Sequence, residues 1–168
     1  MADTIYKELR KKLDLTREEV CDEASKKNQI LTYERLERIE NGKFNIHPEE
    51  VVLLSEIYKE PSLCNHYCSQ MCEIGQKYVP EVKVKDLAQI VLEMLSSLNT
   101  MKKSQERLIE ITADGNIDES EIKDFVFIQQ ELERISITVE TLQLWVEQMP
   151  ANGKINIEKY NEIKGLSD

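Results

Sequence analysis

The 168-residue sequence contains no long hydrophobic run, because no stretch of apolar residues approaches the roughly 20 that a helix needs to cross a bilayer. The first residues, Met1 to Glu8, are polar and charged and lack the apolar core of a secretory signal. We therefore expect no association with a membrane, and a cytoplasmic location in which the thiols stay reduced.

The sequence is also poor in glycine and histidine, with 5 and 2 residues respectively. The glycines form no phosphate-binding loop, and neither His47 nor His66 belongs to a nucleophile or acid–base motif. Lone histidines of this kind usually cap a helix or lie on the surface. The sequence therefore predicts a protein that is not an enzyme and needs no cofactor.

Positive charge is scarce as well. The chain has 22 Lys and Arg against 32 Asp and Glu, a formal net charge of -10. Contacts with phosphate dominate affinity for nucleic acid, so this charge excludes a general nucleic-acid coat. A local basic edge is still compatible with the sequence of residues 1–60. Its candidate members are Lys11, Lys12, Arg17, Lys26, Lys27, Arg35, Arg38 and Lys43.

What is present is a pair of short helices with clear ends. Thr16 precedes a Glu-rich first turn with Glu19 three residues on, the arrangement of a capping box, and this predicts a helix over about 17–24. Thr32 is a second N-cap, and Asn41-Gly42 is a left-handed helix stop, which together predict a helix over 32–40.

Helices are also predicted on both sides of this pair. Upstream, Ile5, Leu9 and Leu13 have helical spacing, and Asp14 tolerates the left-handed conformation that ends a helix. Downstream, Pro48 suits a first helical turn, and a fifth helix is compatible with the sequence after Pro61.

Together these features resemble the Cro/C1-type (XRE family) helix-turn-helix domain of phage-repressor-like regulators, over about residues 4–75. The resemblance is carried by Leu9-Arg10, Leu15-Thr16, Glu18-Glu19-Val20, Ala24, Ile39-Glu40-Asn41-Gly42-Lys43 and Pro48. It implies an all-α fold with a lambda-repressor-like five-helix DNA-binding domain over residues 1–78. It also implies that the helix over 32–40 enters the major groove of double-stranded DNA.

Roles for individual residues follow from the resemblance. Arg10 and Glu40 match a buried ion pair that ties the first helix to the recognition helix. The implied DNA-binding residues are Arg17, Thr32, Tyr33, Glu34, Arg35, Glu37, Arg38, Lys43 and Asn45. Glu34 and Glu37 are compatible with two roles: they accept from cytosine N4, or they pair within the helix, as Glu34 would with Arg38.

The second half, residues 79–168, has a different pattern. The spacing between apolar residues alternates between three and four positions, which predicts two long helices, each with a heptad seam. The first seam is Val84, Leu87, Val91, Met94, Leu98, Met101 and Leu108, with Gln105 as the polar interruption; the second is Phe125, Ile128, Leu132, Ile135, Val139, Leu142, Val146 and Met149.

A turn over residues 112–118 separates the two predicted helices, and Asp118 with Glu121 would cap the second. An antiparallel hairpin follows, with a short final helix that includes Ile157, Tyr160 and Ile163. Its apolar surface is too wide for two helices to bury, so we expect a homodimer. The alternative is a monomer whose hairpin packs onto its own N-terminal domain.

Four cysteines leave three interpretations open. They are Cys21, Cys64, Cys68 and Cys72. Buried cysteines commonly act as small hydrophobic residues, so we expect these four to pack in the core and to bind no metal. Three thiolates with a fourth ligand would suit zinc, and a thiol pair would suit a redox switch.

The sequence thus predicts a sequence-specific, DNA-binding transcriptional regulator. The alternatives are a protein-binding adaptor or antirepressor that keeps the fold without binding DNA, and a metal- or redox-sensing regulator that uses the cysteines.

Overall fold

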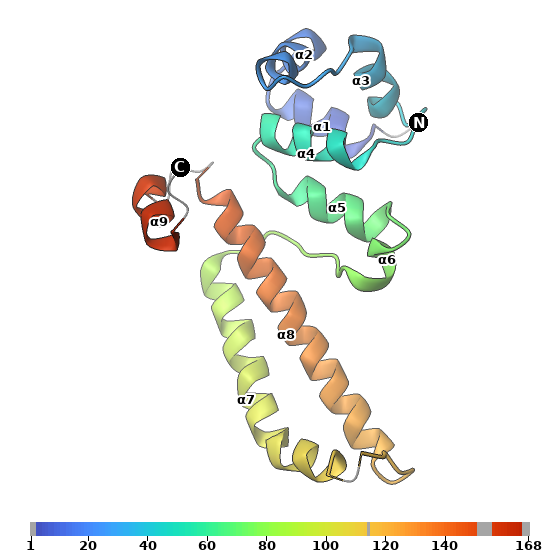
Figure 1. Ribbon diagram of the computed structural model, residues 1–168, viewed down its shortest axis with the longest axis vertical. Coiled ribbons are helices and arrows are strands. Elements are labelled where there is room, and N and C mark those ends of the chain that lie inside the picture. The colour runs from blue at the N-terminus through green and yellow to red at the C-terminus, as the bar shows by residue number, and fades with distance from the viewer. Residues whose placement is uncertain (1–2, 114, 151–155, 166–168) are drawn as a thin grey trace. The chain divides into compact units, whose positions relative to one another are not determined.

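The computed structural model describes residues 3–113, 115–150 and 156–165 (Figure 1). All regular secondary structure within these ranges is helical, which confirms the predicted all-α class. The chain divides between Glu81 and Val82 into two compact units.

The N-terminal unit consists of short helices. They are α1 (Ile5–Lys12), α2 (Arg17–Lys26), α3 (Tyr33–Glu40), α4 (Pro48–Ile57), α5 (Ser62–Gln70) and α6 (Gly75–Tyr78). The predicted capping box of α2 is confirmed: Glu19 N donates to Thr16 Oγ1 at 3.2 Å, and Thr16 N donates to the Glu19 carboxylate at 2.7 Å. Such local contacts set where the chain enters each helix.

Left-handed residues follow four of these helices, and the one after α4 is Lys59, with φ 52°. The predicted stops at Asp14, with φ 53°, and at Gly42, with φ 64°, are both confirmed. Helix α2 runs to Lys26, past the predicted end near residue 24, because its left-handed residue is Asn28, with φ 57°. Asp and Asn are the non-glycine residues that tolerate this conformation best.

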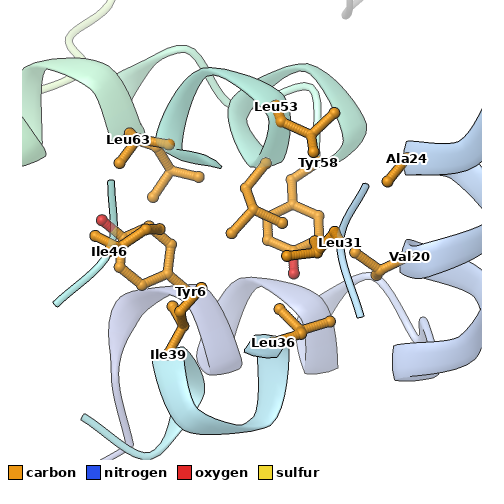
Figure 2. Close-up of a cluster of buried hydrophobic side chains, with 12 residues drawn as sticks. Tyr6, Val20, Ala24, Leu31, Leu36, Ile39, Ile46, Leu53, Tyr58 and Leu63 are labelled. Carbon is orange, nitrogen blue, oxygen red and sulfur yellow. The ribbon is translucent and has the colours of Figure 1, made fainter. Parts of the chain in front are cut away.

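One hydrophobic core joins α1 to α5 (Figure 2). Its buried members are Tyr6, Val20, Ala24, Leu31, Leu36, Ile39, Ile46, Val51, Leu53, Leu54, Tyr58 and Leu63. Leu36 of α3 has no exposed surface and belongs to this cluster (Figure 2). Because α3 contributes to the core from one side only, its other side is available for function.

Helix α6 packs against α5 at a glycine. A Cβ atom on Gly75 would lie 2.0 Å from the backbone oxygen of Cys68. The two helices therefore approach more closely than any residue with a side chain would allow.

The C-terminal unit contains α7 (Leu87–Ile111), α8 (Ile122–Gln148) and α9 (Ile157–Lys164). Helices α7 and α8 run antiparallel and pack along their length (Figure 1). Asp86 caps α7 by accepting from Gln89 N at 3.0 Å. The predicted reciprocal contacts of Asp118 and Glu121 are present: Glu121 N donates to Asp118 Oδ1 at 3.1 Å, and Asp118 N donates to Glu121 Oε2 at 3.3 Å. They close a turn directly before α8, which begins at Ile122.

The predicted heptad seams are buried only in part: Ile128 and Met149 are buried, and several other seam residues are half-buried. Of the seam residues, Val91 and Leu98 on α7 and Leu132 and Val139 on α8 are exposed. Most of the buried residues of the two helices lie one position before a seam residue. The buried residues are Ile90, Ser97, Ile111, Ile128, Glu131, Thr138, Thr141, Leu144 and Gln148. The packed face is therefore more polar than the sequence pattern predicted.

Candidate nucleic-acid interface

Helix α3 has one buried side and one exposed side. Leu36, Ile39 and Glu40 are buried, while Glu34 and Arg38 are exposed. Thr32 starts the helix by accepting from Arg35 N at 3.2 Å, so its hydroxyl serves as the N-cap. Because eight residues make only about two turns, these few contacts determine which side faces solvent.

The buried side is held by an ion-pair cluster around Glu40. The predicted pair with Arg10 is present: Arg10 Nη2 donates to Glu40 Oε2 at 2.9 Å, and Arg10 Nε donates to Oε1. Arg17 Nε also donates to Oε2, at 2.9 Å. Burial alone would raise the pKa of Glu40, but the two guanidinium groups hold it below its usual value. Helices α1, α2 and α3 are thus joined through one carboxylate.

Arg17, which the resemblance assigns to DNA, is engaged within the protein. Beyond Glu40, its Nη1 donates to Tyr33 Oη at 3.1 Å and to Glu37 Oε1 at 3.3 Å. The guanidinium also lies 5.3 Å from the centre of the Tyr33 ring. Its side chain is only 16% exposed, so it positions α2 against α3 in this structure.

Arg35 is engaged in the same way. Its Nε and Nη2 each donate to the Glu50 carboxylate at 2.6 Å, and Nη2 also donates to the Asn45 carbonyl at 3.0 Å. Burial would raise the pKa of Glu50, but this bidentate contact lowers it. Glu50 Oε2 in turn accepts from His47 N, so Arg35 fixes the loop between α3 and α4.

The exposed side presents a different set of predicted residues. Arg38 and Lys43 are exposed, and no described carboxylate lies within ion-pair distance of either. The Arg38 guanidinium lies 5.9 Å from the centre of the Phe44 ring, whose other neighbour is Arg35 at 5.2 Å. Phe44 is 55% exposed and belongs to no apolar periodicity in the sequence.

A shallow hollow adjoins this exposed side. It is lined by Gly42, Lys43, Phe44, Asn45 and His47. Two predicted residues, Lys43 and Asn45, therefore lie together on its wall. Thr32, Tyr33, Glu34 and Glu37 lie at least partly exposed along α3 and at its start.

Carboxylates neutralise most of the predicted basic edge. Eight basic residues were predicted to form this edge. Three of the lysines pair with a carboxylate: Lys11 with Asp3 at 2.7 Å, Lys26 with Glu23 at 2.6 Å, and Lys27 with Glu56 at 2.8 Å. With Arg17 and Arg35 also paired, three remain without an ion pair among the described residues. These are Lys12, Arg38 and Lys43.

The cysteines lie in the same unit but do not form a metal site there. Within the described ranges, no three His, Cys, Asp or Glu side chains converge as metal ligands. Burial raises the pKa of the Cys21 and Cys68 thiols, with nearby carboxylates adding to the effect at Cys21 and neighbouring cysteines at Cys68. A raised pKa disfavours the thiolate that metal binding and oxidation both need.

Comparisons of the chain with protein-family models, with curated proteins and with solved structures found no match. Among the described helices, none is both long enough and apolar enough to span a membrane.

Proposed function

We propose that the protein is a sequence-specific DNA-binding transcriptional regulator with a lambda-repressor-like five-helix head, as its resemblance to the Cro/C1-type (XRE) family implies. Helix α3 would enter the major groove. The observation that carries this proposal is the two-sided character of α3: its inner side is fixed by Leu36 and the Glu40 cluster, and its outer side is polar and exposed. Access to DNA would place the protein in the cytoplasm of its cell.

The exposed residues divide into two proposed roles. Arg38 and Lys43 have charges that no described carboxylate neutralises, so they suit contacts with guanine or phosphate. Tyr33, Glu34 and Asn45 offer polar groups for base edges, and Glu34 suits the N4 amino group of cytosine. Thr32 and Glu37 are further candidates for contacts with DNA, at the edge of the exposed side of α3.

Arg17 and Arg35 take a different role in this proposal. Each guanidinium is occupied by carboxylates, Arg17 by Glu40 and Glu37 and Arg35 by Glu50. They would therefore position α3 and the following loop rather than read bases. A positioning role predicts that their removal lowers stability as well as affinity.

The second candidate function is a protein-binding adaptor or antirepressor. The observation that favours it is electrostatic: five of the eight basic candidates are paired with carboxylates, and the whole chain carries a net charge of -10. A surface of this charge suits a basic protein better than DNA. Selection of bound fragments from random DNA duplexes by the full-length protein at low salt separates the two, since only a DNA reader would enrich a sequence.

Arg38→Ala is the variant that tests the DNA proposal. We expect a 10- to 100-fold loss of affinity for the selected fragment, because one good base contact contributes about 1–3 kcal/mol. The free energy of unfolding should stay within about 0.5 kcal/mol of the wild type, because Arg38 is exposed. Fluorescence anisotropy and urea unfolding measure the two quantities.

Two matched variants complete this experiment. Arg35→Ala should lower the free energy of unfolding by about 2 kcal/mol, because it leaves Glu50 without its charged donor. Lys103→Ala removes an exposed charge from α7 and should leave both quantities unchanged. No enriched sequence, or wild-type affinity in Arg38→Ala, would favour the adaptor.

A further inference from the structure

The hairpin of the C-terminal unit has its polar and apolar residues in an unusual arrangement. Between the arms, Ser97 of α7 and Glu131, Thr138 and Thr141 of α8 are buried. Soluble helices normally bury apolar side chains where they pack and expose polar ones. Here a large part of the apolar surface lies outside the contact between α7 and α8.

Four of the exposed apolar residues follow buried ones by a single position. Val91 and Leu98, next to Ile90 and Ser97, are 42% and 47% exposed. On α8, Leu132 and Val139, next to Glu131 and Thr138, are 50% and 39% exposed. The offset is the same on both helices.

This common offset places both apolar rows on one side of the hairpin. In a right-handed helix, the next residue lies about 100° further round the axis. Two antiparallel helices that face one another turn in opposite senses when seen from one end, so the same offset leads to the same side of the pair. The rows form one surface, called the outer face below, made of Leu87, Val91, Leu95, Leu98, Ile109, Leu132 and Val139.

The size of the outer face fits a second copy of the chain. From Leu87 to Ile109 the outer face extends over 22 residue steps of α7, about 33 Å at the standard rise. Two adjacent helices, each about 10 Å wide, give a face of about 660 Å², within the roughly 600–1,000 Å² per partner of a stable interface. Helix α9, with eight residues and a length of about 12 Å, is too short to cover it.

We propose that the outer faces of two chains pack against each other, so that α7 and α8 of both chains form a four-helix bundle. An isologous pair needs the same apolar surface on both partners, and an identical chain supplies it at equal length. The inference deepens the dimer expected for the proposed regulator by naming the surface that forms it. It does not require that the protein bind DNA.

Sedimentation equilibrium of the full-length protein, without DNA, tests the proposal. We expect the wild type to approach twice 19.6 kDa, about 39 kDa, within the micromolar range. Val91→Glu combined with Leu98→Glu should weaken self-association at least 100-fold, because it places unpaired charges in the interface. Gln89→Glu combined with Ser96→Glu adds the same charge at exposed positions on the opposite side of α7 and should leave the mass unchanged.

Leu132→Glu tests the outer face independently from α8 and should also weaken the dimer. Circular dichroism should report wild-type helix content in all variants, because every substituted residue is exposed. A wild type that stays monomeric at the highest concentration would overturn the proposal, and the outer face would then have another occupant. A dimer that survives both outer-face variants would overturn it too. Because no DNA is present, neither result depends on the proposed DNA contacts.

Discussion

At the scale of single residues, Glu40 contributes most to the geometry of the candidate interface. Its carboxylate has no exposed surface and accepts from Arg10 of α1 and Arg17 of α2. A buried charge of this kind is costly to leave unpaired, so the cluster is stable only as a set. The orientation of α3 is therefore fixed from two other helices through one side chain.

Glu40→Gln should lower the free energy of unfolding by about 3 kcal/mol at pH 7, because two guanidinium groups lose their anionic partner. The pKa of Glu40 is lower in the folded protein than its usual value, so the ion pair stabilises the fold above about pH 4.5 and is lost as the pH falls through the folded pKa. The difference between variant and wild type should therefore narrow below about pH 4.5. Urea unfolding between pH 7 and pH 3 measures it.

The control for this experiment is Glu34→Gln, which removes an exposed carboxylate from the same helix. Its effect on the free energy of unfolding should stay within about 0.5 kcal/mol. A difference between Glu40→Gln and wild type that does not change with pH would contradict the proposed charge-based role.

The sequence could not separate the three arginines that bear on α3. Arg17, Arg35 and Arg38 are the same residue type, and the resemblance assigned all three to DNA. Their partners are distant in the chain: Glu40 lies 23 residues from Arg17, and Glu50 lies 15 residues from Arg35. Contacts of this separation depend on how the helices pack, which local patterns do not encode.

At the scale of helices, the ends were predicted well and the packing was not. The Thr16 and Thr32 caps and the stop at Gly42 depend on residues within four positions, so the sequence contains the whole determinant. The packing of α7 on α8 does not have this local character. The apolar steps of three and four run through Val91, whereas the buried positions of α7 run through Ile90 and Ser97, so the local pattern favours the side that is exposed, and packing against the partner helix decides which side is buried.

Gly75 was also missed, because an isolated glycine in a polar segment gives no signal of a close helix contact. Gly75→Ala should lower the free energy of unfolding by about 1–3 kcal/mol, since its Cβ would meet the backbone oxygen of Cys68, which cannot move cheaply. Amide hydrogen exchange should show α6 losing protection. Lys77→Ala, at an exposed site in the same helix, should change neither quantity; full protection of α6 in Gly75→Ala would contradict the packing argument.

At the scale of the whole molecule, the distribution of charge limits how the protein could bind DNA. A net charge of -10 repels phosphate, and the ion pairs of the N-terminal unit neutralise most of its basic residues. A dimer would then present Arg38 and Lys43 twice. Affinity would depend on a few contacts in defined positions, so base reading would contribute more than general attraction.

This distribution predicts a weak dependence of DNA binding on salt. With Arg38 at a base and Lys43 at a phosphate, two phosphate contacts per dimer correspond to a slope of about -2 in a plot of log affinity against log salt concentration, at about -0.9 per contact. Lys43→Ala should reduce the magnitude of that slope by about 2, because the dimer contains the residue twice. Fluorescence anisotropy with the selected fragment, between 50 and 200 mM salt, gives both values. A slope near -10 would require many more cations at the phosphates, and therefore the release of Arg17 and Arg35 from Glu40 and Glu50; in that case these arginines would bind DNA directly, as the sequence alone predicted.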